Sequence, residues 1–313
     1  MDSNDRIYVA GHNGLVGSAI VRELERQGYN NIIGAPSDRV DLRSQSDVYD
    51  FMTDWQPKYV FLAAAKVGGI IYNRDYPAEF IYDNLMIQSN VIEASATIGC
   101  VKKLLFIGSA CIYPKHAPVP IKEEYLMTGP LEETNQAYAI AKIAGYTMCK
   151  AYTEQYGFPT VSAMPTNLYG INDNFRVEQG HVIPSLINKF IQAKRNGDKT
   201  VRCYGDGSPT REFLFADDLA NGLVFLMNNH DDPNIINLGA DREITIKELV
   251  KMIANIVGYD GEIYWDTSMP NGTPRRALDG SKMNALGWKA KTSLEDGLKK
   301  TIDWYLTSEN VRK

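Results

Sequence analysis

The chain has 313 residues, of which 44% are hydrophobic and 23% are charged, and its formal net charge is −5. This length fits about two domains, and the composition is ordinary for a soluble globular chain with a sizeable core. Proteins that bind nucleic acid through phosphate contacts normally carry a basic surplus, so the acidic balance argues against that class. An anionic small-molecule ligand stays compatible with this charge if a few Lys and Arg side chains gather locally.

Neither a membrane segment nor an export signal is apparent in the sequence. The longest apolar run, residues 59–72, is interrupted by Lys66 and two glycines, so it is too short to span a bilayer. Residues 1–5 lack the basic and apolar stretches of a signal peptide. The four cysteines form neither a CxxC pair nor a metal-binding spacing. These features predict a reduced, cytoplasmic protein without a metal site.

Apolar runs alternate with amphipathic stretches through the first half of the chain. The short runs predict strands at residues 6–10, 31–34, 58–64, 103–108 and 160–164. The amphipathic stretches predict helices at residues 15–26, 46–54, 83–98 and 137–155, with Ser44 or Ser46 as N-cap of the second. Near-continuous apolar strands between helices are typical of a parallel sheet covered on both faces. The predicted fold class is therefore α/β, a Rossmann-like doubly wound parallel sheet.

The pattern changes after Asn167. Loops rich in Gly, Asn, Asp and Pro separate predicted helices at residues 184–196, 217–228 and 245–257. We expect residues 1–168 to form the cofactor-binding domain. Residues 169–313 are expected to form mainly a smaller C-terminal lobe for the substrate, with some segments returning to the Rossmann sheet. Ligands of such sheets bind at the carboxyl ends of the strands, so this lobe would close the site.

A glycine-rich loop lies between the first predicted strand and the first predicted helix. Gly11, Gly14 and Gly17 have the spacing GxxGxxG, which resembles the loop of the short-chain dehydrogenase/reductase superfamily. The first glycine permits a tight turn, the second lets the backbone approach a pyrophosphate, and the third allows close packing of helix on strand. Backbone N–H groups at the start of the helix attract the anion. The context therefore predicts a dinucleotide site rather than a purely structural turn.

The end of the second predicted strand bears on the choice between NAD and NADP. A carboxylate there binds the ribose 2′-hydroxyl, whereas an arginine accommodates a 2′-phosphate. Residues 34–37 contain neither, and Asp38 and Arg39 follow slightly later. The sequence favours NADP and leaves NAD as the alternative cofactor.

Tyr138 and Lys142 lie one turn apart on the same face of a predicted helix. The ammonium of Lys142 is expected to lower the pKa of Tyr138 toward the working pH, so that the phenol can donate a proton to a substrate carbonyl oxygen. Lys142 would also bind the nicotinamide ribose. Ser109 follows the fourth strand at the carboxyl edge, where that oxygen would lie. Together with the glycine loop, these residues predict a catalytic site rather than ordinary helix-surface residues.

Several short blocks occur in order along nearly the whole chain. They are residues 63–70 (AAAKVGGI), 111–115 (CIYPK), 138–145 (YAIAKIAG), 164–170 (MPTNLYG), 173–175 (DNF), 181–184 (HVIP) and 272–275 (GTPR). In this order they resemble the GDP-L-fucose synthase family of the extended short-chain dehydrogenases/reductases. None of the blocks is specific alone, but the ordered set is.

The resemblance implies an enzyme that acts on GDP-4-keto-6-deoxy-D-mannose. Such an enzyme epimerises carbons 3 and 5, whose hydrogens the ketone at carbon 4 acidifies, and then reduces the ketone with NADPH to give GDP-L-fucose. The family's base–acid pair, a cysteine and a histidine, matches Cys111 and His181, which by themselves would be read as a buried thiol and a loop histidine. Tyr138 would stabilise the enolate oxygen and later protonate the alkoxide. The predicted catalytic residues are therefore Ser109, Cys111, Tyr138, Lys142 and His181.

The resemblance also implies two sets of ligand-binding residues. The cofactor set is Gly11, Asn13, Gly14, Leu15, Val16, Gly17, Ser37, Arg39, Asp41, Leu42, Ala63, Ala65, Ile107, Gly108, Lys142, Pro165, Asn167, Leu168 and His181. The substrate set is Lys189, Tyr204, Arg211 and Asp279. Arg211 would face the diphosphate, with a surface salt bridge as its alternative role. Arg275 and Arg276 rank lower, because arginines beside a proline are common on surfaces. Related enzymes form homodimers through the two long helices, which we expect here by analogy.

Five positions depart from the family pattern, and one of them is Ala110, which replaces a serine beside Ser109. Asn13 and Ser37 stand where relatives have arginines, which weakens the expected hold on the NADP 2′-phosphate, and Arg39 is the predicted compensation. Lys189 replaces an arginine and Tyr204 a tryptophan in the guanosine-diphosphate pocket. Lysine keeps the charge of arginine but loses its bidentate geometry. These changes bear on cofactor preference and substrate affinity, and none removes a catalytic group.

Two other kinds of protein share many of these features. A GDP-mannose 4,6-dehydratase-like or 4-epimerase-like enzyme would recycle NAD internally. A dehydratase, however, usually needs an acidic residue beside the catalytic serine, and residues 109–111 (SAC) contain none. A non-catalytic dinucleotide sensor would not need Ser109, Tyr138 and Lys142 together. The epimerase–reductase activity is therefore the predicted function.

Overall fold

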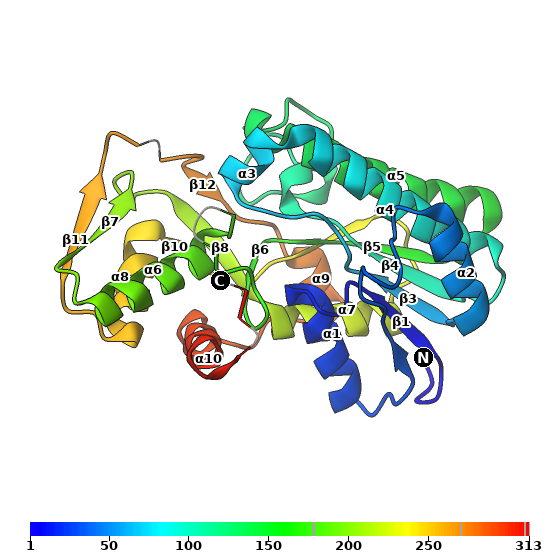
Figure 1. The fold of residues 1–313 in the computed structure, drawn as a ribbon. Coiled ribbons are helices and arrows are strands. Elements are labelled where there is room, and N and C mark those ends of the chain that lie inside the picture. The colour runs from blue at the N-terminus through cyan, green and yellow to red at the C-terminus, as the bar shows by residue number, and fades with distance from the viewer. Residues whose placement is uncertain (177–178, 270, 310, 313) are drawn as a thin grey trace.

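The structure is a computed structural model that describes residues 1–176, 179–269, 271–309, 311 and 312. Its largest element is a six-stranded sheet in which every neighbouring pair is parallel. The strands follow the order β2 (Ile32–Ile33), β1 (Ile7–Ala10), β3 (Tyr59–Leu62), β4 (Lys103–Ile107), β5 (Thr160–Pro165) and β9 (Ile235–Leu238). The predicted doubly wound α/β sheet is thereby confirmed (Figure 1).

Helices cover both faces of this sheet. They are α1 (Leu15–Arg26) and α7 (Ala216–Asn229) on one face, and α2 (Gln45–Trp55), α4 (Pro77–Thr97) and α5 (Gln136–Tyr156) on the other. Successive strand residues point to opposite faces. Ile7 and Val9 therefore belong to the core beneath α1 and α7, whereas Tyr8 and Ala10 belong to the core beneath the other three helices. Because β1 is buried on both faces, it reads as a continuous apolar run.

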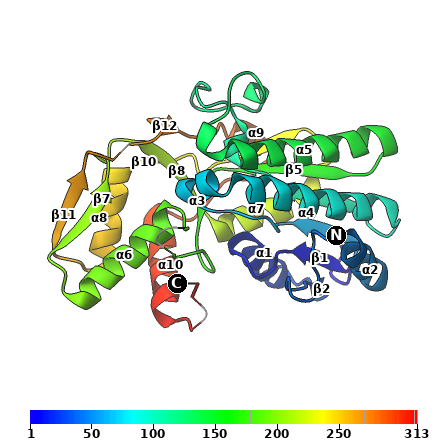
Figure 2. The ribbon, with the colours of Figure 1, turned by 45° about the horizontal axis from the view of Figure 1, so that its top comes forward.

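A smaller lobe lies beside the carboxyl ends of these strands (Figure 1, Figure 2). Its strands are β6 (Asn167–Tyr169), β7 (Thr200–Tyr204), β8 (Thr210–Phe215), β10 (Glu243–Thr245), β11 (Glu262–Asp266) and β12 (Arg275–Arg276). Its main helices are α6 (Val182–Asn196), α8 (Ile246–Val257) and α10 (Leu294–Thr307). Side chains of these elements form a third hydrophobic core of their own. The remaining helices are α3 (Ile70–Asp75), α9 (Ser281–Ala285) and the 3₁₀ turns η1 (Ala110–Ile112), η2 (Glu123–Tyr125) and η3 (Glu133–Asn135).

Several predicted boundaries differ from the structure. The helix predicted at residues 83–98 begins at Pro77, because proline fits the first turn of a helix, where no N–H partner is needed. The helix predicted at 217–228 was placed with the lobe, and this was wrong. That helix, α7, packs on α1, and its Leu219 and Leu223 share the core of Ile7. Helix α7 and strand β9 are therefore the segments by which the chain returns to the Rossmann sheet, as expected for part of residues 169–313. Ser44 is confirmed as the N-cap of α2, since its Oγ accepts from the N–H of Asp47.

Within the described ranges, no helix combines the length and the apolar character needed to cross a membrane. In the same part of the chain, no group of three or more His, Cys, Asp and Glu side chains is arranged to hold a metal ion.

Candidate active site

The glycine loop forms a close-fitting cradle at the end of β1. Gly11 has φ +84°, and a Cβ there would lie 2.8 Å from the Cα of Ala64. A Cβ on Gly17 would lie 2.1 Å from the carbonyl oxygen of Gly11, so α1 rests directly on the loop. Gly14 is the N-cap of α1 and makes no side-chain cap hydrogen bond. The first N–H groups of α1 are therefore free of side-chain caps, as a dinucleotide pyrophosphate requires.

The far end of this cradle contains a histidine that the sequence analysis did not single out. The ring of His12 occupies the space beside Gly34, where a Cβ would lie 2.4 Å from the ring Cγ. Its Nδ1 is buried and has no hydrogen-bond partner in the described part of the chain, and burial lowers the pKa of His12. The predicted cofactor residues Asn13, Ser37 and Arg39 are exposed. The contact between His12 and residue 34 requires a glycine at that position, and this glycine was its only indication in the sequence.

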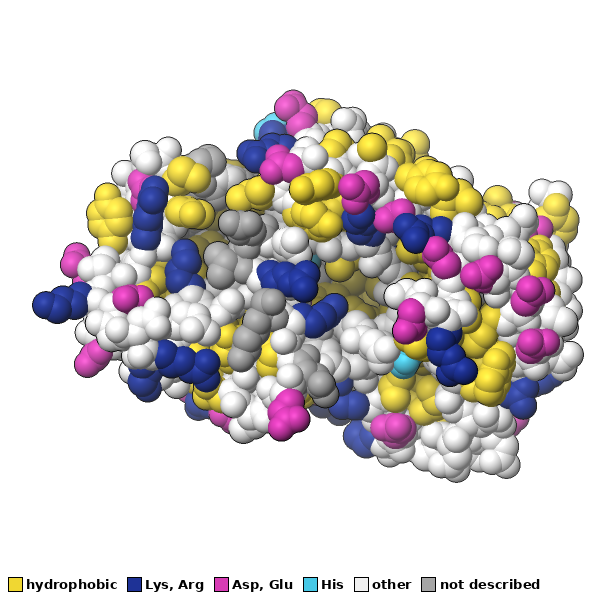
Figure 3. Space-filling model, in the orientation of Figure 1, with side chains coloured by type: hydrophobic (Ala, Val, Ile, Leu, Met, Phe, Trp, Pro, Cys, Tyr) yellow, Lys and Arg dark blue, Asp and Glu magenta, His cyan; other side chains and the backbone are white. Residues whose placement is uncertain are grey.

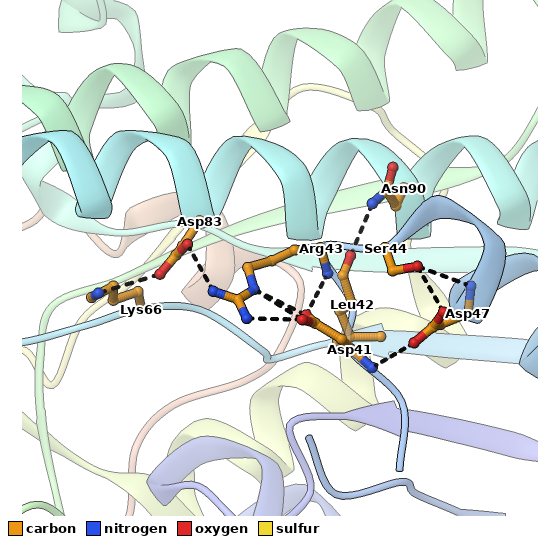
Figure 4. Close-up of polar contacts among 8 residues, drawn as sticks. All are labelled: Asp41, Leu42, Arg43, Ser44, Asp47, Lys66, Asp83 and Asn90. Carbon is orange, nitrogen blue, oxygen red and sulfur yellow. Dashed lines mark hydrogen bonds and ion pairs between the residues drawn. The ribbon is translucent and has the colours of Figure 1, made fainter. Parts of the chain in front are cut away.

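A series of ion pairs connects the loop at residues 41–44, which precedes α2, to α4 (Figure 4). Arg43 donates from Nε (3.0 Å) and Nη2 (2.8 Å) to the carboxylate of Asp41, which lowers the pKa of Asp41. Arg43 also reaches Asp83 of α4, and Asp83 pairs with Lys66 at 3.3 Å. The Leu42 carbonyl accepts a hydrogen bond from another α4 side chain. Asp41, a predicted cofactor residue, thus already has a cationic partner that the sequence analysis did not anticipate.

Ser109 and Cys111 lie in the turn that follows β4. Ser109 is extended and caps η1, where its Oγ accepts from the N–H of Cys111 at 3.3 Å. Gly108 before it is closely packed, since a Cβ would lie 2.2 Å from the sulfur of Met164 and the Met164 side chain would have to move. Burial raises the pKa of the Cys111 thiol, while the hydrogen bond with Ser109 and the charges of Arg276 and Lys142 oppose that rise.

Tyr138 and Lys142 project from α5 toward the same turn. Lys142 is buried, and its Nζ donates to the carbonyl of Ile107 at 2.8 Å. Burial lowers the pKa of Lys142 to about 8. The Nζ lies 5.8 Å from the centroid of the Tyr138 ring.

The expectation that Lys142 lowers the pKa of Tyr138 was wrong for this structure. Burial raises that pKa far above its usual value, and the nearby Cys111 raises it further. A hydrogen bond with Ser109 acts in the opposite direction but is the weaker cause. The desolvation of the phenolate outweighs any attraction to the ammonium. Tyr138 is therefore a protonated phenol here, and such a group can donate a proton but cannot accept one.

His181 belongs to the lobe, where it is the N-cap of α6. The residue is partly open to solvent. Desolvation by the neighbouring protein atoms nevertheless lowers the pKa of His181, so its imidazole is neutral near pH 7. The segment before it is attached to the Rossmann part, since the N–H of Gly69 donates to the carbonyl of Gln179 at 2.9 Å. The Nδ2 of Asn73 holds that loop through the carbonyls of Gly68 (2.7 Å) and Gly69 (3.1 Å).

Two arginines of the lobe face this region from adjacent strands. Arg211 of β8 and Arg276 of β12 are partners in a parallel register. Both are half-buried, and within the described residues neither has a carboxylate within 4.0 Å, so the surface salt bridge considered for Arg211 is absent there. Burial lowers the pKa of each guanidinium. The structure therefore brings Arg276, which ranked low in the sequence analysis, beside Arg211.

The remaining predicted substrate residues fall in two places. Lys189 and Tyr204 line a surface cavity of about 410 Å³, with Lys189 Nζ 5.1 Å from the Tyr204 ring centroid and 2.8 Å from the carbonyl oxygen of Arg202. Asp279 lies elsewhere. Its carboxylate accepts from the N–H of Ser281 at the start of α9, and its charged neighbours are Lys122 and Lys282. Asp279 thus shares none of these contacts with Lys189 or Tyr204.

The space-filling view agrees with a site between the two parts of the molecule. Figure 3 shows Lys and Arg side chains near the middle of the face, beside a hollow with hydrophobic side chains in its depth. The glycine cradle, the Ser109–Tyr138–Lys142 group and the parallel sheet together define a dinucleotide-dependent enzyme of the extended short-chain dehydrogenase/reductase class.

Comparisons with known proteins agree with this class. The model of the NAD dependent epimerase/dehydratase family matches residues 7–239. The putative GDP-L-fucose synthase 2 of Arabidopsis thaliana is 54% identical over 311 residues, which cover 99% of this chain and 94% of that protein. The chain belongs to the NAD dependent epimerase/dehydratase family and, within it, to the branch of the GDP-L-fucose synthases.

Two solved structures are similar over nearly the whole chain. A GDP-L-fucose synthetase from Naegleria fowleri bound to NADP has a TM-score of 0.93 and 31% identity, covering 100% of this chain and 96% of that one. A GDP-D-glycero-L-gluco-heptose synthase from Campylobacter jejuni, solved in the presence of NADPH, has a TM-score of 0.92 and 37% identity. It covers 98% of this chain and 100% of its own.

Proposed function

We propose that this protein is a GDP-L-fucose synthase. It epimerises GDP-4-keto-6-deoxy-D-mannose at carbons 3 and 5 and then reduces the ketone at carbon 4 with NADPH. The observation that carries the proposal is the convergence of Ser109, Cys111, Tyr138 and Lys142 at the carboxyl end of β4. The high identity to GDP-L-fucose synthases over the full length supports the choice of substrate.

Epimerisation needs a base on one face of the sugar and an acid on the other. We assign the base to Cys111, whose thiolate takes a proton from carbon 3 or carbon 5. The C–H bond breaks, an S–H bond forms, and the electron pair moves into the carbonyl oxygen as an enolate. His181, which comes from the lobe rather than from the sheet, returns a proton to the opposite face. Its ring is neutral near pH 7, so it must gain the proton that it donates from solvent or from the substrate.

Tyr138 serves both stages as a hydrogen-bond donor to the oxygen at carbon 4. Because burial raises its pKa, the phenol keeps its proton while the enolate forms, and hydrogen bonding then stabilises the negative oxygen. In the second stage the same proton passes to the alkoxide. The ammonium of Lys142 can then donate a proton to the Tyr138 phenolate, and its pKa of about 8 favours this transfer near neutral pH.

The cofactor cradle suits NADPH in its central part. Gly11 and Gly17 let the loop pack against Ala64 and α1, and Gly14 places no side chain at the start of α1, where a pyrophosphate would bind. NADPH supplies the hydride that reduces carbon 4 when it is bound. Arg39 is the cation that we assign to the 2′-phosphate, because it is exposed on the loop after β2. We assign the cofactor to the Rossmann part and the sugar nucleotide to the lobe, where Arg211 would meet the diphosphate.

The proposed activity is tested by incubating the protein with GDP-4-keto-6-deoxy-D-mannose and NADPH. We expect one NADPH to be oxidised for each GDP-L-fucose formed, identified by NMR of the product. A dehydratase-like or 4-epimerase-like enzyme would turn over without net NADPH oxidation, and a dinucleotide sensor would not turn over. Unchanged absorbance of the reduced nicotinamide would therefore contradict the proposal.

A second candidate substrate comes from the Campylobacter jejuni structure named as a GDP-heptose synthase, which is 37% identical to this chain. A GDP-4-keto-heptose carries one more carbon at the end of the sugar, so it needs more room beside carbon 5. The same assay with the heptose substrate separates the two cases. We expect a higher kcat/KM for the 6-deoxyhexose, and the reverse order would assign the chain to the heptose substrate.

Gly69 offers a test of the role of His181. A Cβ at this position would lie 2.7 Å from the backbone oxygen of Gly180, so Gly69→Ala must displace the segment that carries His181. A displacement of about 1 Å costs on the order of 10²-fold in a positioned step. We expect deuterium incorporation at carbons 3 and 5 to fall by about this factor.

The matched control for this variant is Gly129→Ala. A Cβ on Gly129 would meet only Pro114 side-chain atoms at 3.4 and 3.7 Å, which is ordinary contact. Exchange in Gly129→Ala is expected at the wild-type rate. If Gly69→Ala exchanges both carbons as fast as Gly129→Ala does, the segment before His181 does not position it.

We propose that the protein acts as a homodimer through α4 and α5. These helices pack side by side (Figure 2), and the residues Tyr82 of α4 and Ile140 of α5 are 60% and 42% exposed. The adjacent α3 exposes Ile70 and Ile71 as well. Exposed apolar side chains on neighbouring elements are typical of an interface between copies.

Light scattering after size exclusion checks this assembly. We expect a dimer for the wild-type chain and a monomer for Tyr82→Glu, because a buried unpaired carboxylate is costly. Leu306→Glu is the matched control, since Leu306 is also half exposed, at 50%, but lies on α10. A wild-type monomer, or a dimer that Tyr82→Glu leaves intact, would contradict the proposed interface.

A further inference from the structure

The two successive arginines of β12 have different surroundings. Arg275 is exposed and makes a bidentate pair with Glu243, at 2.7 and 2.6 Å. Arg276 is half-buried, and its Nη2 donates at 2.6 Å to the carbonyl of Ala110, which lies 166 residues earlier in the chain. Alternation along a strand explains why the two side chains point to opposite faces. Arg276 therefore connects the lobe to the turn after β4.

This contact falls immediately before Cys111. Ala110 opens the 3₁₀ turn η1, and Cys111 is its second residue. Ser109 holds the N–H of Cys111 on one side of the turn, and Arg276 holds the Ala110 carbonyl on the other. The backbone that carries the thiol is thus fixed by one group from the Rossmann part and by one from the lobe.

No carboxylate of the described residues lies close enough to neutralise the charge of Arg276. Within the described ranges no acidic side chain lies within 4.0 Å of its guanidinium, and Glu132, whose charge it senses, pairs with Lys115 at 3.3 Å. A guanidinium has five N–H donors in a planar fork, and the Ala110 contact uses one of them. The positive charge also acts on Cys111, where it opposes the effect of burial on the thiol pKa.

We propose that Arg276 is a positioning residue for Cys111, which fixes the turn of the thiol and favours its thiolate over its thiol. The inference rests on the proposed function, in which that thiolate is the base of the epimerisation. Because Arg276 belongs to the lobe, the base is fully prepared only when the lobe contacts the turn at Ala110. Lys142 supplies a second positive charge from α5, but its Nζ is bound to the Ile107 carbonyl.

The test measures the thiol directly, without substrate. The rate at which iodoacetamide alkylates Cys111 is followed from pH 6 to 10, with peptide mass spectrometry to separate this cysteine from the other three. In Arg276→Met we expect the apparent pKa of Cys111 to rise by about one unit, because an opposite charge nearby shifts a pKa by about that much. Alkylation at pH 7 then falls about tenfold.

Two further variants keep the test decisive. Arg276→Lys retains the charge and is expected to restore most of the alkylation rate, whereas Arg275→Met removes the neighbouring arginine and is expected to leave it unchanged. Unfolding is monitored by circular dichroism, and if Arg276→Met does not fold, Arg276→Gln, which also removes the charge, takes its place in each comparison. A Cys111 pKa that is the same in Arg276→Met and wild type, or a shift of equal size in Arg275→Met, would overturn the inference.

The substrate-dependent readout separates this inference from the proposed function. Deuterium exchange at carbons 3 and 5 is expected to fall about tenfold at pH 7 in Arg276→Met and to recover as the pH rises. If wild type shows no exchange at all, the proposed function fails while the alkylation result still stands. If wild type exchanges and Arg276→Met exchanges equally fast across the pH range, the role of Arg276 fails alone.

Discussion

The Cys111→Ser variant is expected to lose deuterium exchange at carbons 3 and 5 by about 10²- to 10⁴-fold, the usual contribution of a positioned base. A serine hydroxyl has nearly the size of the thiol but is far less acidic, so the base is lost while the turn is kept. Exchange is followed by NMR in heavy water with GDP-4-keto-6-deoxy-D-mannose and NADP⁺, which prevents reduction from removing the ketone.

The same variant is expected to bind NADPH as wild type does, because Cys111 lies in η1 and not in the glycine cradle. Since burial raises the pKa of the Cys111 thiol, wild-type exchange is expected to increase with pH as the thiolate forms. Wild-type exchange rates in Cys111→Ser would remove this cysteine from the mechanism.

The Tyr138→Phe variant is expected to lose reduction of carbon 4, with a fall in hydride transfer on the order of 10²- to 10⁴-fold. The phenylalanine ring fills the same space between Phe80 and Lys142 but offers no proton for the alkoxide. Single-turnover oxidation of enzyme-bound NADPH measures this step. Exchange at carbons 3 and 5 is also expected to slow, since the enolate oxygen loses its donor.

Tyr146→Phe is the matched control, because Tyr146 lies on the same helix, is also half-buried and lines a separate cavity near His230. Its NADPH oxidation is expected at the wild-type rate. Near-normal turnover of Tyr138→Phe, with Tyr146→Phe also active, would refute the assignment of Tyr138 as the proton donor.

Local sequence patterns were sufficient to predict the Rossmann part. The amphipathic period of residues 15–26 gives α1 its observed bounds, and nearly continuous apolar runs mark β1 and β4 because these strands are buried on both faces. The lobe was less predictable. The period of α7 showed which of its faces is apolar but not that this face meets α1 rather than α6. Such a return depends on tertiary packing that no local window contains.

The candidate site also has a part that the sequence predicts and a part that only the structure shows. Ser109, Tyr138 and Lys142 could be placed from the sequence, because each lies at a fixed offset from a strand end or within one helix turn. The pKa of Tyr138 could not be predicted, since it depends on burial rather than on the spacing to Lys142. Arg276 ranked low because arginines beside a proline are common on surfaces, and its partner, the Ala110 carbonyl, lies 166 residues away in the sequence. A backbone acceptor leaves no trace in a sequence pattern.

A single product analysis tests the central claim that one site performs both epimerisation and reduction. The protein is given GDP-4-keto-6-deoxy-D-mannose and unlabelled NADPH in heavy water, and the product is examined by NMR. The account predicts GDP-L-fucose with deuterium at carbons 3 and 5 and with hydrogen at carbon 4, because the first two come from solvent-exchanged side chains and the third from the cofactor. A reduced 6-deoxy sugar without deuterium at carbons 3 and 5 would contradict it.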